Sequence, residues 1–147
     1  ERRVGVWQDV SSTTHDRIRR SIEAALTKGE SLDEMAARIG KGLKSGNGTQ
    51  AMRIARTETT ATMNHGNHSA RRSLNIAKKE WITRADDRVR GGGTKDRYTH
   101  ISSEGQVRKN DKPFDVSGEQ MLYPADSSLG ASAGNVVNCR CISIARL

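Results

Sequence analysis

The chain has 147 residues, of which 33% are hydrophobic and 3% aromatic, so it can form one domain with a modest core but not two domains of ordinary size. Its formal net charge is +8, and residues 1–84 hold 16 basic and 9 acidic side chains, so nearly all of the excess lies in this part. This balance favours contact with DNA or with an acidic protein surface, whereas the few aromatic residues argue against a dedicated reader of RNA or single strands. No apolar run is long enough to cross a membrane.

Two helices are predicted near the N-terminal end. Residues 12–28 place apolar side chains at helical spacing, and Gly29 follows as a stop signal. Ser31 and Glu34 then have the form of a capping box, in which each side chain bonds the other residue's backbone N–H. They precede the apolar series at residues 35–43, which predicts a second amphipathic helix.

A third, longer helix is predicted from Thr49 to about Ala77. It follows the glycine-containing stretch 41–49, which interrupts the helical periodicity and leaves Thr49 as a candidate cap. The predicted apolar face of this helix comprises Met52, Ala55, Thr59, Met63 and Ala70.

After Lys79 the pattern becomes typical of strands. The predicted strands are residues 81–83, 98–102, 106–108 and 136–145. The second and third are expected to form a hairpin, and residues 127–135 are expected to be a mobile loop.

Helices followed by strands predict an α+β fold, with N-terminal helices packed on a small, mostly antiparallel C-terminal sheet. We expect a single domain over residues 1–147, mainly helical in residues 1–79 and mainly strand in residues 80–147. Because the chain begins with Glu1 and not Met, we also expect an upstream segment to be missing from it.

Cys139 and Cys141 are the sharpest local feature. In a strand, residues at positions i and i+2 point to the same face, so both sulfurs could chelate one soft metal such as zinc, with His100 as a third ligand. A disulfide across so short a span would be strained. The sequence favours the plainer interpretation of two small core residues, and a redox or reactive-thiol role is a third alternative.

His65 and His68 lie three residues apart, on one face of the predicted third helix. They could bind a metal or act as an acid and base pair on phosphate. No carboxylate lies close in sequence to orient either ring, so a solvated polar face is the favoured interpretation.

An ordered series of short motifs resembles the phage Mu F-like head morphogenesis family. The series comprises Arg-Thr-Glu at 56–58, Lys-x-Trp at 79–81, Asp-x-Arg-Val-Arg at 86–90, His100, and Asn-Cys-Arg-Cys at 138–141, within about residues 30–147. Its motif residues are Arg56, Glu58, Trp81, Asp87, Arg88, Arg90, Asn138 and Arg140. The chain departs from the usual pattern at residues 91–95, which lengthen the distance from Arg90 to His100.

The resemblance implies a minor capsid protein of the virion, assembled in the host cytoplasm and acting at the portal vertex or capsid interior in head assembly and DNA delivery. The implied partners are the portal protein, other capsid proteins and, without sequence preference, packaged DNA. Some relatives carry an added toxin or nuclease domain, and none is expected here because the chain ends soon after Cys141. The resemblance identifies no catalytic residue.

Two other functions stay open from the sequence. One is a small nuclease-like enzyme that uses His65, His68 or His100, although a protein without catalytic activity is favoured. The other is a zinc-stabilised DNA-binding module. Candidate contacts with DNA or a protein partner are Arg17, Arg19, Arg20, Arg71, Arg72, Lys78 and Lys79.

Overall fold

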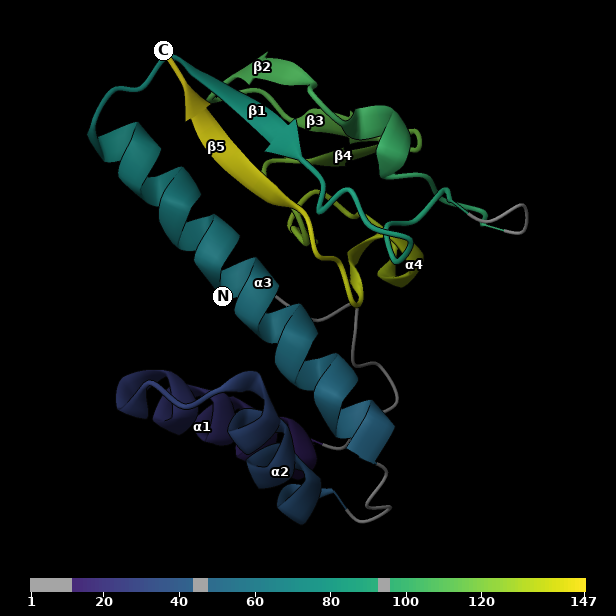
Figure 1. Cartoon of the computed structure of the whole chain (residues 1–147). Helices are drawn as coiled ribbons and strands as arrows, with labels where there is room; N and C mark the ends of the chain where they lie inside the picture. The colour runs from purple at the N-terminus through teal and green to yellow at the C-terminus, as the bar shows by residue number, and fades with distance from the viewer. Residues whose placement is uncertain (1–11, 44–47, 93–95) are drawn as a thin grey trace.

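The computed structural model describes residues 12–43, 48–92 and 96–147, without the side chains of residues 12–15. In chain order, its elements are α1 (Ser12–Lys28), α2 (Leu32–Gly42), α3 (Gly48–Ser73), β1 (Lys78–Ile82), η1 (Ile101–Ser103), β2 (Val107–Lys109), β3 (Phe114–Val116), β4 (Glu119–Met121), α4 (Ala133–Val136) and β5 (Ile142–Arg146). The predicted α+β class is confirmed, since the three N-terminal helices precede small antiparallel sheets (Figure 1). No helix in the described ranges has the length and apolar character needed to span a membrane.

The predicted capping box begins α2. The backbone N–H of Ser31 donates to a Glu34 carboxylate oxygen at 2.8 Å, and the Glu34 N–H donates to Ser31 Oγ at 3.3 Å. The apolar faces of α1, α2 and the first part of α3 then pack together. The buried residues of this helical cluster are Ile18, Ile22, Ala25, Met35, Ala36, Ile39, Ala51, Ile54 and Ala55.

The buried face of α3 differs from the predicted apolar face. It comprises Ala51, Ile54, Ala55, Thr57, Ala61, Asn64, His68 and Arg71. The assignment of Met63 and Ala70 to a buried face was wrong, because both are exposed, Met63 at 59%. The second half of α3 therefore buries polar side chains, and two of them, Asn64 and Arg71, bond backbone groups of residues 141–143 beside the helix.

Helix α3 also ends four residues before the predicted Ala77. Asn75 has φ 53, a left-handed conformation that stops a helix, and its N–H donates to Arg72 O at 3.1 Å. The N–H of Ile76 donates to Arg71 O at 2.9 Å. This pair of bonds is a Schellman motif, which satisfies carbonyls at the helix end.

The main sheet has the strand order β2-β1-β5, and all its neighbours are antiparallel. Its central strand β1 pairs with the last strand in a register that sets Trp81 opposite Ser143. The strand predicted around Trp81 and the final strand thus share one sheet. In Figure 1, α3 runs beside β5, which is an edge strand of this sheet.

The second sheet, the hairpin of β3 and β4, was not predicted from the sequence. Its two-residue turn consists of Ser117 at φ 55 and Gly118 at φ 79. Positive φ at both central residues is the geometry of a type I′ turn, which matches the twist of the flanking strands. Phe114, Val116 and Met121 from this hairpin are fully buried beside Trp81.

The predicted hairpin of residues 98–102 and 106–108 was wrong. Residues 101–103 form the 3-10 helix η1, and β2 pairs with β1 instead. Short polar side chains explain the difference, because Ser102 Oγ donates to Thr99 O and the Ser102 N–H donates to Thr99 Oγ1. Such local bonds compete with a strand ladder.

The final strand is shorter than the predicted residues 136–145, since β5 covers Ile142–Arg146 and begins six residues later than expected. Asn138 has φ 60, which interrupts an extended chain, and its N–H donates to Thr57 Oγ1 on α3 at 2.8 Å. Part of the loop expected at residues 127–135 is helical, because α4 begins at Ala133.

Candidate functional site

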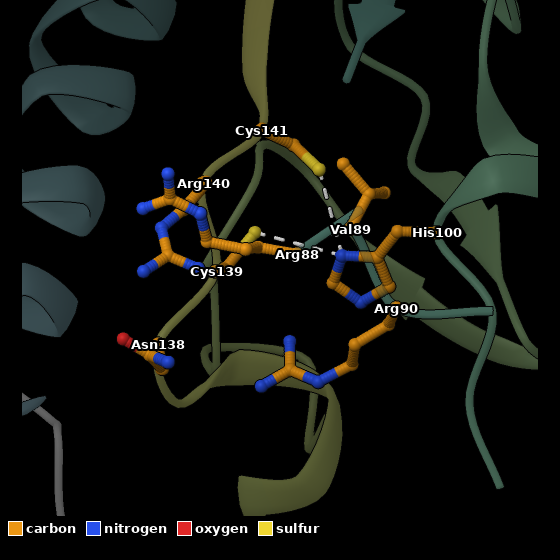
Figure 2. A pocket seen from close by; sticks show the side chains of 8 residues that line it. All are labelled: Arg88, Val89, Arg90, His100, Asn138, Cys139, Arg140 and Cys141. Atoms are coloured by element: carbon orange, nitrogen blue, oxygen red, sulfur yellow. Dashed lines mark hydrogen bonds between the residues drawn. The ribbon is translucent and has the colours of Figure 1, made fainter. Parts of the chain in front are cut away.

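His100, Cys139 and Cys141, which the sequence offered as possible metal ligands, lie close together in the structure. Their ligand atoms all lie within 4.8 Å of one another, and all three residues are buried. Cys141 Sγ lies 3.5 Å and Cys139 Sγ 3.7 Å from the same atom, His100 Nδ1 (Figure 2). The three side chains therefore form a group that could hold a metal ion.

The two cysteines lie in the extended segment that leads into β5. Cys139 and Cys141 therefore present their sulfurs to one side, as expected for positions i and i+2. His100 is fixed by its own backbone, because its N–H donates to Arg90 O at 2.8 Å. The Arg90 guanidinium in turn donates to Asn135 O at 3.2 Å and to Val137 O, which ties this segment to the one that carries the cysteines.

Asn135 determines which nitrogen of His100 carries the proton. Its side-chain NH2 group donates to Val116 O at 2.8 Å and to a Glu119 carboxylate oxygen at 3.0 Å. Asn135 Oδ1, 2.8 Å from His100 Nε2, must therefore accept a proton from that nitrogen. His100 Nδ1 is then left with a free lone pair that faces the two sulfurs, and a neutral imidazole of this tautomer is a metal ligand.

The two thiols differ in acidity. The pKa of Cys139 lies well below its ordinary value, chiefly because the Cys141 thiol donates a hydrogen bond to its sulfur. The pKa of Cys141 is raised by that same hydrogen bond and by burial. Cys139 is therefore the more acidic of the two thiols, and thiolate is the form of cysteine that binds metal.

A pocket with about 90 Å³ of space opens beside the His100–Cys139–Cys141 group. Its lining includes all three of these residues together with Arg88, Val89, Arg90, Asn138 and Arg140 (Figure 2). Arg56 lies nearby on α3 and donates to Asn138 Oδ1 at 2.8 Å. Its pKa is lowered by burial and by repulsion from Arg140 and Arg88.

Most of the family-motif residues lie around this pocket. Arg88, Arg90, Asn138 and Arg140 line it, and the Trp81 ring meets His100 edge to face at 5.7 Å between centroids. Two others lie elsewhere: the Asp87 side chain is 94% exposed, and Glu58 lies on α3. Most residues of the motif series therefore lie in one region of the fold.

The seven candidate contact residues separate into two groups. Arg17, Arg19, Arg20, Arg72 and Lys78 are exposed. Arg71 and Lys79 are buried, so their assignment to an accessible basic surface was wrong. Both are part of the packing instead: Arg71 bonds Asn110 and Ser143, and Lys79 Nζ donates to Leu122 O at 2.6 Å.

The helical histidines have separate environments. His65 is exposed, whereas His68 is only 5% exposed and its ring lies 5.5 Å from that of Tyr123. The interpretation of His68 as part of a solvated face was therefore wrong. Its pKa is lowered to about 4 by burial and by the nearby Lys79, Arg71 and Arg72. Neither residue joins the group around His100 in the described part of the chain.

Sequence reasoning missed Asn135, whose role depends on partners from β3 and β4. It lies in a segment of mostly small residues and glycines, whose sequence does not indicate burial. In the structure, Asn135 is fully buried. Only its position after folding shows that it orients His100.

Comparison with known protein families identifies a match that covers most of the chain. Residues 16–144 match the family described as Phage Mu protein F like protein. No curated protein and no solved structure matches the chain. The matched segment includes every residue of the pocket and of the His100–Cys139–Cys141 group.

Proposed function

Because this chain belongs to the Phage Mu protein F-like family of phage head morphogenesis proteins, we propose that it is a minor capsid protein acting at the portal vertex or in the capsid interior. In this role it takes part in head assembly and in delivery of the packaged DNA. It is assembled in the host cytoplasm and remains in the virion. The observation that carries this proposal is the family match over residues 16–144.

The exposed basic side chains of α1 support contact with a polyanion. Arg17, Arg19 and Arg20 lie within four residues and are all exposed, and the ion pairs of Arg19 with Asp16 and Glu23 are long, at 4.0 Å. Phosphate neutralisation by such side chains releases counterions and needs no base readout. Packaged DNA and an acidic surface of the portal protein both carry the negative charge that these arginines bind.

The test is a triple reversal, Arg17→Glu with Arg19→Glu and Arg20→Glu. Retention of duplex DNA, and separately of the portal protein, is measured between roughly 50 and 200 mM salt, where 6–10 phosphate contacts lose about 10³–10⁵ in affinity. Arg108→Glu, on β2 and exposed, is the matched control. Binding that ignores salt, or that survives the triple reversal unchanged, removes this surface from the partner contacts.

The group His100, Cys139 and Cys141 is further proposed to bind zinc. Zinc–sulfur bonds of about 2.3 Å and zinc–nitrogen bonds of about 2.0–2.1 Å at tetrahedral angles separate S and N ligands by roughly 3.5 Å. The S···N distances of 3.5 and 3.7 Å agree with that separation. The chemistry of two cysteines and one neutral histidine is also that of zinc sites.

Elemental analysis of the purified protein tests this proposal. We expect about one zinc per chain in the parent and a loss of zinc in Cys139→Ser and in His100→Ala. His65→Ala, an exposed histidine outside the group, should retain the metal. Parent protein without zinc, after purification free of chelators and refolding with zinc, would contradict the assignment.

We also propose that residues 1–147 form a single domain of this family. The support is α3, which contributes Ile54 to the helical cluster and Ala61 to the cluster around Trp81. Unfolding followed by helix content and by tryptophan fluorescence should then give coincident transitions.

A further inference from the structure

Positive charge gathers in the pocket beside His100 without an acidic side chain in the lining. The described residues that line it include Arg88, Arg90 and Arg140 and no Asp or Glu. Arg56 lies close enough to be repelled by Arg140 and Arg88. Since like charges held together cost free energy, an arrangement of this kind is typical of an anion-binding site.

The four guanidinium groups differ in how far they are already engaged. Arg90 is occupied by two backbone carbonyls, and Arg56 by the side chain of Asn138. Arg88 forms long ion pairs of 3.9 Å with Asp86 and Asp87, and its side chain is 65% exposed. Arg140 has no hydrogen bond or ion pair with any described residue, so its donors are available for a ligand.

We infer that this pocket binds a phosphate group, held by Arg140 and Arg88 next to the open position of the His100–Cys139–Cys141 zinc centre. The position of the phosphate next to the zinc centre rests on the zinc proposal. Three protein ligands leave one of four tetrahedral positions free, and the three ligands line the same pocket as the arginines.

The size of the pocket agrees with this ligand. Its space of about 90 Å³ is several times the roughly 10–15 Å³ that a single water requires, and is suited to one small tetrahedral anion. The planar guanidinium of Arg140 can donate two parallel bonds to phosphate oxygens. The phosphate can belong to free phosphate or to a DNA backbone, and both present the same oxygens.

The experiment uses the zinc-loaded full chain and inorganic phosphate as the probe, with binding measured by calorimetry. Arg140→Gln should weaken phosphate binding at least about tenfold, because it removes a charge-assisted pair, while zinc content and near-UV circular dichroism stay as in the parent. Arg108→Gln, on the exposed strand β2, should bind phosphate as the parent does. Phosphate binding that is equal in the parent and Arg140→Gln overturns the inference.

A cobalt-substituted sample tests the position of the ligand. Phosphate that enters the open coordination site should change the visible absorption of the bound cobalt, and an unchanged spectrum at saturating phosphate overturns this placement. A second arm repeats the Arg140→Gln comparison with a duplex DNA oligonucleotide. Weakened retention of DNA identifies the backbone as the source, and unaltered retention with weakened phosphate binding identifies a small phosphate compound.

Failure of this inference can be told apart from failure of the zinc proposal. Parent protein that carries zinc but does not bind phosphate leaves the zinc centre in place and removes the phosphate site. Parent protein that lacks zinc contradicts the metal assignment, and the calorimetric comparison of Arg140→Gln with the parent still decides whether the arginines bind phosphate.

Discussion

The side chain of Asn64 accepts a hydrogen bond from the backbone N–H of Ser143 at 3.0 Å, and thereby pairs α3 with the outer edge of β5. The same side chain donates to Cys141 O at 3.1 Å. One buried amide thus replaces the bonds that a neighbouring strand would supply.

Asn64→Leu should therefore destabilise the fold. It leaves the Ser143 N–H and the Cys141 carbonyl buried without a partner, at a cost on the order of 1–3 kcal/mol for each group. We expect a loss of about 2–6 kcal/mol in the free energy of unfolding, measured with urea. Asn67→Leu, at an exposed position on the same helix, should change it by less than about 0.5 kcal/mol. Equal effects of the two substitutions would contradict the role of Asn64.

Two adjacent arginines at the end of α3 should respond differently to charge reversal. Arg71→Glu removes hydrogen bonds to Asn110 and to Ser143 and buries an unpaired carboxylate, so we expect a loss of at least about 3 kcal/mol. Arg72→Glu, which is exposed, should cost less than about 1 kcal/mol through the helix dipole. Thermal unfolding of the two variants distinguishes a packing role from a surface role.

Stability should fall with acid because of His68. Its pKa is about 4 in the folded protein and 6.5 when unperturbed, so the unfolded chain binds a proton between these values while the folded protein does not. The stabilisation is complete above pH 6.5 and decreases as the pH falls towards 4, by roughly 3 kcal/mol at most. His68→Gln should flatten the dependence of the unfolding free energy on pH between 4.5 and 6.5. His65→Gln should leave this pH dependence as it is in the parent. A parent protein whose stability is constant over this range would rule the mechanism out.

Asn135→Ala should weaken zinc binding without removing a ligand. Loss of Asn135 Oδ1 frees the His100 ring to rotate and to change tautomer, and outer partners of this kind contribute about 10–100-fold to metal affinity. Competition with a chromophoric chelator measures the change. The far-UV circular dichroism of the variant should match the parent, so that reduced affinity is separated from unfolding. Unaltered affinity would show that Asn135 does not orient His100.

Two glycines should respond in opposite directions to alanine. A Cβ at Gly66, within α3, meets no atom within 4 Å, so Gly66→Ala should stabilise the helix by roughly 0.5–1 kcal/mol. A Cβ at Gly134 would lie 2.3 Å from Tyr98 Cε2, so Gly134→Ala should destabilise by about 1–3 kcal/mol. Melting temperatures of the two variants should therefore lie on either side of the parent value.

The sequence predicts those features that depend on local chemistry. The capping box at Ser31 and Glu34 was confirmed because its bonds join residues three apart. The spacing of Cys139 and Cys141 likewise gave the correct common face. These patterns need no knowledge of the rest of the fold.

Features that depend on distant partners were not predicted. Hydrophobic periodicity placed Met63 on the buried face of α3, whereas the helix buries Asn64 and Arg71 because an open strand edge needs hydrogen-bond donors and acceptors there. The short hairpin around Ser117 was missed for a similar reason, since its three-residue strands are too brief for alternation to be recognised.

The backbone bond between the His100 N–H and Arg90 O joins the two ends of the segment between these residues. A second bond, from the Gly91 N–H to an Asp96 carboxylate oxygen at 2.8 Å, closes the first part of that segment on itself. Since loop-closure entropy grows slowly with length, added residues here cost little and leave the imidazole where it is. This stretch is therefore a suitable place to insert an epitope tag or a fluorophore-binding peptide.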